Sequence, residues 1–181
     1  HAVLSLVRDA LPNDPLFQLI LGHVYCAGGI YQEALAAYGQ CVRLASAAEA
    51  RILALEAQLG TAECYFRQGD LAQAAPIIER LLPHWNADFI RMMEEPLRVY
   101  LAVYEILAAL EHPQAAAILA EGKAFLAGYL DGLHDPALRE SLLRRRIAQA
   151  LNSLVQARSN KAGFSQQPVY LSSRHRSWRV Q

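Results

Sequence analysis

The 181-residue chain lacks several features that mark other protein classes. It has no uninterrupted apolar run near the roughly 20 residues of a membrane span, and no signal-peptide pattern opens it. Its three cysteines form no CxxC pair, and their odd count argues against a disulfide framework. We therefore expect a cytoplasmic protein that makes no contact with a membrane.

Catalytic motifs are also absent. The sequence contains no P-loop, no GxSxG and no HExxH. Glu94 and Glu95 are adjacent, but neighbours on a helix point about 100° apart and cannot act as paired acids. His23 and Cys26 lie three apart, and two ligands do not make a metal site. We expect no enzyme activity, no cofactor and no metal.

Helix-forming residues dominate what is present. Ala, Leu, Glu, Arg and Gln fill long stretches, and apolar residues make up 54% of the chain. Short breaks separate these stretches at 11–15, 27–30, 67–70, 82–86, 111–113 and 133–136. Asp70, Asn86 and Asp135 are suited to begin helices. The pattern predicts an all-α protein built of antiparallel helix hairpins.

Two segments repeat one pattern around a turn glycine. Relative to Gly29 and Gly69, matching residues stand at −7, −4, +2, +5, +9 and +12. They are Gly22, Tyr25, Tyr31, Ala34, Tyr38 and Cys41 in the first copy, and Ala62, Tyr65, Leu71, Ala74, Ile78 and Leu81 in the second. Small residues at −7 and +5 let paired helices approach closely, and bulky ones at +9 pack on the next hairpin.

This small–aromatic–Gly–small–aromatic order resembles the tetratricopeptide repeat (TPR). The copies run from about 15 to 44 and 55 to 84 and start 40 residues apart, so we expect the first helix of the second copy to extend through 46–53. A third, degenerate pair covers 97–126, with Glu111 at the glycine position and Ala116 at +5. The resemblance implies a TPR-like right-handed α-solenoid over 1–159, with about three and a half hairpins and a terminal helix.

A narrower resemblance covers most of the chain. The stretches at 10–45, 59–82 and 115–143, the last with "DPALRESLL", are similar to the TPR-like array of large bacterial STAND-type ATPase regulators. In those proteins the array accompanies an ATPase module and an output domain. The resemblance implies a sensor and interaction segment of a signalling or transcription regulator, which binds a protein, a peptide, an effector or its neighbouring domains.

The first helix of each TPR pair lines the groove of the array. The resemblance thus assigns groove contacts to Leu19, His23, Leu59, Glu63, Phe66, Leu101 and Glu105. The Lys and Asn of chaperone-binding TPR domains are missing at such places. An apolar and mildly acidic groove favours a basic or amphipathic helix as the ligand.

Charge is divided unevenly along the chain. Residues 1–135 hold sixteen acids and eight bases, whereas 136–181 hold one acid and nine bases. A basic patch is expected from Arg144, Arg145, Arg146, Arg174, Arg176 and Arg179, and 160–181 is interpreted as a basic tail or linker. We favour docking of this tail on the chain's own acidic surface or a neighbouring domain over nucleic-acid binding.

Two hypotheses for the function remain open. The first is the non-catalytic binding module of a regulator, and the alternative is a free-standing TPR adaptor or oligomerisation scaffold. The chain opens on what is interpreted as the second helix of a hairpin, with Val3, Leu4 and Val7 on its apolar face. We expect self-association through this end, because a terminal repeat without a polar cap exposes apolar surface.

Overall fold

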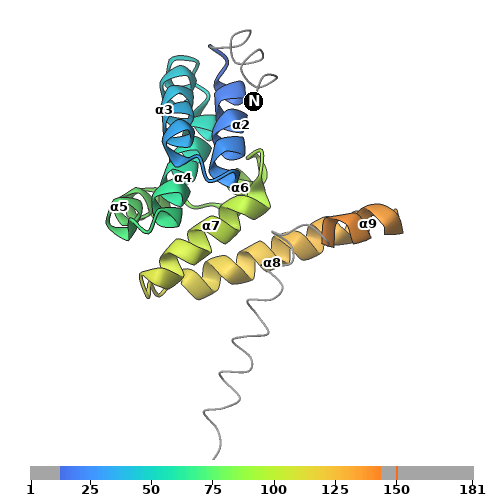
Figure 1. Cartoon of the computed structure of the whole chain (residues 1–181). Coiled ribbons are helices and arrows are strands. Elements are labelled where there is room, and N and C mark those ends of the chain that lie inside the picture. Colours follow the sequence, from blue (N-terminus) through green and yellow to red (C-terminus); the bar gives the residue numbers. More distant parts are fainter. Residues whose placement is uncertain (1–12, 144–149, 151–181) are drawn as a thin grey trace, which may run out of the picture.

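The computed structural model describes residues 13–143 and Ala150, and these residues are helical without a strand. Figure 1 shows α2, α3 and α4 upright beside one another, with α7 and α8 crossing below them. The elements are α2 (Pro15–Ala27), α3 (Tyr31–Ala47), α4 (Arg51–Arg67), α5 (Leu71–Leu81), η1 (Leu82–His84), α6 (Ala87–Arg91), α7 (Pro96–Ala109), α8 (Ala115–Asp131) and α9 (Pro136–Leu143). The prediction of an all-α protein is confirmed. The solenoid and its handedness stay predictions.

The predicted hairpin turns share one backbone conformation. Gly29 and Gly69 have φ values of +74° and +80°, and Glu111 has +52°. In each turn the next N–H donates to a carbonyl five residues back, at 2.9 Å. These are Schellman turns, in which the left-handed residue lets the last helical carbonyls find donors. Glu111 therefore adopts the conformation of the turn glycine that it was predicted to replace.

A fourth turn of this kind corrects the predicted boundary of α4. Glu49 has a φ of +57°, and the N–H of Ala50 donates to the carbonyl of Ala45 at 2.8 Å. This turn ends α3 at Ala47, so α4 begins only at Arg51. The predicted extension of α4 through 46–53 is confirmed for 51–53 and wrong for 46–50, because those five residues complete α3 and form the turn instead.

Tyr38 shows why small residues recur at helix crossings. Its ring, fully buried on α3, lies between Gly22 of α2 and Gly60 of α4. A methyl group added at either glycine would come within about 2.4 Å of ring atoms, far inside van der Waals contact. The predicted small position at −7 is confirmed for Gly22. The role of Gly60 was not predicted.

The small residues at +5 behave differently in the third hairpin. Ala34 and Ala74 are fully buried, as the repeat register predicts. Ala116 is exposed, and its neighbour Ala115 is buried instead. The third turn is longer than the first two, with 110–114 between α7 and α8, so spacings counted from the turn residue do not carry over to α8. The assignment of Ala116 to the helix contact is therefore wrong.

Two apolar clusters make up the core of this part of the chain. One joins α2, α3 and α4 around Leu19, Tyr38 and Cys41. The larger one joins α4, α5, α7 and α8, and the connection 82–95 contributes Ile90 and Met93 to it. The segments 1–12 and 160–181, with the predictions placed on them, lie outside the described residues.

Candidate functional site

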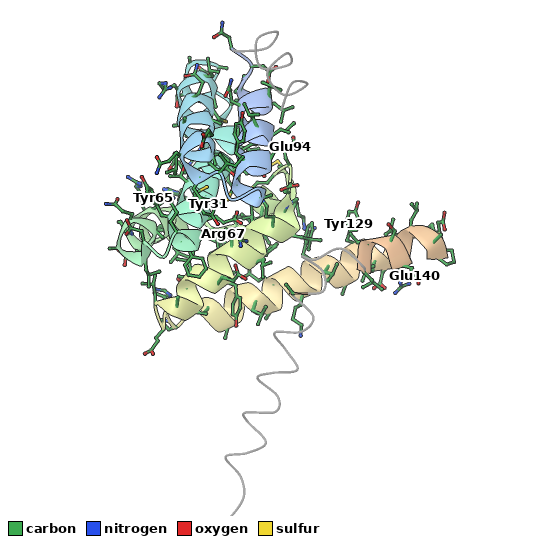
Figure 2. All side chains as sticks on the ribbon, viewed as in Figure 1. Tyr31, Tyr65, Arg67, Glu94, Tyr129 and Glu140 are labelled. Carbon is green, nitrogen blue, oxygen red and sulfur yellow. The ribbon has the colours of Figure 1, made fainter. Side chains whose placement is uncertain are left out.

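A groove runs between the C-terminal half of α2 and one face of α7. Its main hollow has a volume of about 850 Å³, lined by α2, the α2–α3 turn, the middle of α4 and the start of α7. A second hollow of about 470 Å³ continues it, because Tyr31 and Arg67 line both. We call the two hollows together the groove. Figure 2 labels Tyr31, Arg67 and Glu94, three residues of its wall.

Five of the seven predicted groove residues lie along this groove. The main hollow is lined by His23, Glu63 and Leu101, and the second by Phe66 and Glu105. They come from α2, α4 and α7, so the three helices predicted to line a common surface do so. Whether they contact a ligand stays a prediction.

Leu19 and Leu59 are corrections to the predicted set. Leu19 is fully buried at the junction of α2, α3 and α4, because α2 packs on both of the other helices. Leu59 is buried under the 82–95 connection, where it shares a small hollow of about 20 Å³ with Trp85 and Ile90. A ligand in the groove does not reach either leucine.

Arg98 is the groove residue that the sequence analysis missed. It sits on α7, one turn before Leu101, and its Nη1 donates to Glu63 Oε2 at 2.5 Å. Its Nε also lies 2.9 Å from Glu95 Oε2 in an ion pair. Burial alone would lower the pKa of Arg98, but Glu63, Tyr38 and Glu95 together outweigh burial and raise it. One signal was available, since Arg98 is the single basic residue of α7, a mostly apolar helix whose other charged residue is Glu105.

Glu63 is shared by two arginines. Besides Arg98, it accepts a hydrogen bond from Arg67 Nε at 2.8 Å. Arg67 keeps 42% of its side chain exposed, whereas Glu63 keeps 5%. The groove is therefore more polar than the apolar and mildly acidic surface that was predicted, and its floor is an ion-pair network.

His23 connects this network to the next layer. Its Nδ1 lies 2.7 Å from the Tyr38 hydroxyl and also faces the Arg98 guanidinium. Arg98 Nη2 lies 2.5 Å from Nδ1 and 3.2 Å from Nε2 of His23, and since a guanidinium can only donate, we assign the closer Nδ1 as the acceptor and the ring proton to Nε2. That nitrogen lies 3.4 Å from Glu56 Oε1. The predicted groove residue His23 thus bridges Arg98 and a second, deeper carboxylate.

Glu56 caps the start of α7 from a distant helix. Its side chain is fully buried, and its two oxygens accept the backbone N–H groups of Glu94 and Glu95 at 2.8 and 3.1 Å. α7 has no capping side chain of its own at Glu95; Glu56 instead accepts the N–H of this N-cap residue and of the residue before it, as the glutamate of a capping box accepts the N-cap N–H. Burial alone would raise the pKa of Glu56, but the hydrogen bonds from His23 and these N–H groups lower it.

The three thiols are buried, and one of them touches the groove. Cys26 lines the main hollow, and a hydrogen bond from the neighbouring Cys64 thiol lowers the pKa of Cys26. The same bond, with burial, raises the pKa of Cys64. Burial raises the pKa of Cys41 to about 11. Within 13–143, no three His, Cys, Asp or Glu side chains gather as metal ligands.

The arginines of the predicted basic patch all lie outside the described residues. Among the helices that are described, none has the length and apolar character needed to cross a membrane. No protein-family model, curated protein or solved structure matches the chain.

Proposed function

We propose that the chain is a non-catalytic binding module that holds a protein or peptide ligand in the groove. The observation that carries this proposal is the groove itself, with a main hollow of about 850 Å³ and five of the seven predicted contact residues along its walls. Sites of this volume are large enough to bury side chains of a ligand. The scaffold behind them is an interlocked network, which suits binding without rearrangement.

From the resemblance to STAND-type regulators we propose that this module belongs to a cytoplasmic bacterial signalling or transcription regulator. The repeated hairpins on which that resemblance depends are supported by the Schellman turns at Gly29, Gly69 and Glu111, and by the buried small residues Ala34 and Ala74. In such a regulator the segment would report ligand occupancy to a neighbouring ATPase or output domain. The oligomerisation scaffold is the second candidate.

One observation favours the second candidate. Tyr129 and Leu138, on α8 and α9, keep 54% and 57% of their surface exposed. Large exposed apolar side chains are typical of protein contacts when they form a continuous surface. Sedimentation of wild type and of Tyr129→Ser/Leu138→Ser over a range of concentrations tests it. A dimer that dissociates in the double variant supports the scaffold, and a monomer at all concentrations contradicts it.

A peptide library tests the binding proposal. Peptides selected on the chain are titrated against wild type and against Ala27→Trp, because Ala27 is exposed and lines the main hollow. The indole should fill the groove and weaken binding at least tenfold. Ala72→Trp is the matched control, exposed on α5 outside the groove. Equal binding to both variants, or no selected peptide at all, would contradict the proposal.

A further inference from the structure

The wall of the groove on α2 carries a row of exposed apolar side chains. Ile20 and Val24 keep 46% and 45% of their surface exposed, and both line the main hollow. They stand one helical turn apart, about 6 Å along the axis. Leu16 continues the row by another turn and is 36% exposed, but it lies outside the hollow. This spacing matches the apolar side chains at i and i+4 of a second helix.

The opposite wall of the groove is also apolar at its centre. Leu101 and Ala102 of α7 line the main hollow across from the row on α2. Both are almost fully buried, so they give a firm surface without projecting into the groove. If the apolar face of a ligand packs between Ile20, Val24 and this wall, apolar surface on both sides of the ligand is removed from water, which favours binding.

The charges along the groove favour a cationic partner. Four carboxylates line the two hollows, against two guanidinium groups. Glu63 and Glu95 together neutralise both arginines, since Glu63 contacts Arg67 and Arg98 and Glu95 pairs with Arg98. The excess negative charge therefore falls on the other two carboxylates, Glu94 in the main hollow and Glu105 in the second.

The negative charge of Glu105 is also poorly compensated by the groups around it. It is half-buried, and burial raises the pKa of Glu105 more than the charge of Arg67 lowers it. A carboxylate in this condition gains from a cation brought close to it. A Lys or Arg on the ligand would supply that cation at the end of the groove opposite Glu94.

We infer that the ligand of the groove is an amphipathic helix whose apolar face packs on Ile20 and Val24 and whose flanking Lys or Arg side chains meet Glu94 and Glu105. This inference rests on the proposed function and names the chemistry of its ligand. Acidic and carboxylate-terminated peptides are disfavoured, because the two arginines that could hold them are occupied by Glu63.

Three synthetic 18-residue peptides test the inference by fluorescence anisotropy. The first is a Leu/Lys peptide with leucines at helical spacing, the second replaces each Lys with Glu, and the third has the Leu/Lys composition in scattered order. We expect the first to bind at least tenfold more tightly than either other peptide. We also expect its binding to weaken as salt rises, since part of the attraction is electrostatic.

Matched variants locate the binding. Ile20→Ala/Val24→Ala should weaken the Leu/Lys peptide about tenfold or more, whereas Leu16→Ala should leave it within twofold. Glu94→Gln/Glu105→Gln should weaken it several-fold and flatten the salt dependence. Glu33→Gln, exposed on α3, controls for the loss of surface charge.

The outcomes separate this inference from the proposed function. Equal binding of the three peptides, preference for the Leu/Glu peptide, or insensitivity to the α2 and glutamate variants would overturn the inference. Peptides selected from a library that still lose affinity with Ala27→Trp would then keep the proposed function standing. If the library peptides also bind Ala27→Trp as tightly as wild type, the inference and the proposed function are both contradicted.

Discussion

Replacing Glu56 with Gln should destabilise the fold by about 2–4 kcal/mol, a large fraction of the 5–15 kcal/mol typical of a domain. Glu56 has two oxygens for the backbone N–H groups of Glu94 and Glu95, and His23 Nε2 lies near one of them. Gln keeps the shape but offers one oxygen and an NH₂ group. One backbone N–H then faces a donor, and the remaining hydrogen bond is no longer charge-assisted.

The magnitude follows from these lost contacts. A hydrogen bond to a charged group contributes about 1.5–3 kcal/mol, and an orphaned buried donor costs about 1–3 kcal/mol. These terms overlap for one N–H, so they combine to about 2–4 kcal/mol. The substitution should also free the start of α7, because no other side chain caps it.

Urea unfolding followed by circular dichroism measures the difference at pH 7. Glu33→Gln, exposed on α3, is the control and should stay within about 0.5 kcal/mol of wild type. Because the pKa of Glu56 is lowered from its ordinary 4.5, its stabilisation is present above pH 4.5 and is lost as the pH falls through the lower value of the folded state. The gap between wild type and Glu56→Gln should therefore narrow below pH 4.5.

Amide hydrogen exchange supplies an independent readout. In wild type the N–H groups of Glu94 and Glu95 should exchange slowly, and in Glu56→Gln at least one should exchange faster than its neighbours in α7. A variant within about 0.5 kcal/mol of wild type, with both amides still protected, would refute the capping role of Glu56.

Three further predictions follow from packing, turn geometry and thiol chemistry. Gly60→Ala should lower the free energy of unfolding, measured by thermal melting, by about 1–3 kcal/mol, because its methyl group would clash with the Tyr38 ring. Gly39→Ala is the control and should stabilise α3 by about 0.5–1 kcal/mol, because its methyl group would meet only the end of the Arg43 side chain, at 3.7 Å. Glu111→Gly should raise stability by up to about 1 kcal/mol in urea, since its φ of +52° suits glycine; a clear loss would contradict the turn argument. Iodoacetamide labelling read by mass spectrometry should modify Cys26 before the other two cysteines, because it lines the groove and its pKa is lowered; equal rates would contradict this order.

Features set by short sequence separations could be predicted. The turns at Gly29 and Gly69 and the buried Ala34 and Ala74 depend on spacings of a few residues around one glycine. Such spacings map directly onto one face of a helix. The same reasoning placed Glu111 in a turn, and its positive φ shows that the turn geometry is kept without glycine.

Features set by long separations could not be predicted in this way. Glu56 meets its backbone partners 38 and 39 residues along the chain, and Arg98 meets His23 across 75. Nothing in the local pattern around Glu56 distinguishes a buried capping carboxylate from a solvated one. Leu59 was misplaced for a related reason, because the covering segment 82–95 comes from outside its own hairpin.

The network beneath the groove also limits how a cationic ligand can bind there. Glu63 is 5% exposed and holds Arg98, which in turn contacts His23 and Glu95. A ligand cation that displaced Arg98 from Glu63 would leave a buried guanidinium without its strongest partner, a loss of about 3–5 kcal/mol. Glu94 and Glu105 also line the groove, but they are not the carboxylates that hold Arg98. A ligand cation can therefore contact them and leave the network intact. The buried ion pairs thus fix the shape of the groove, whereas Glu94 and Glu105, which lie outside the network, determine which ligands it prefers.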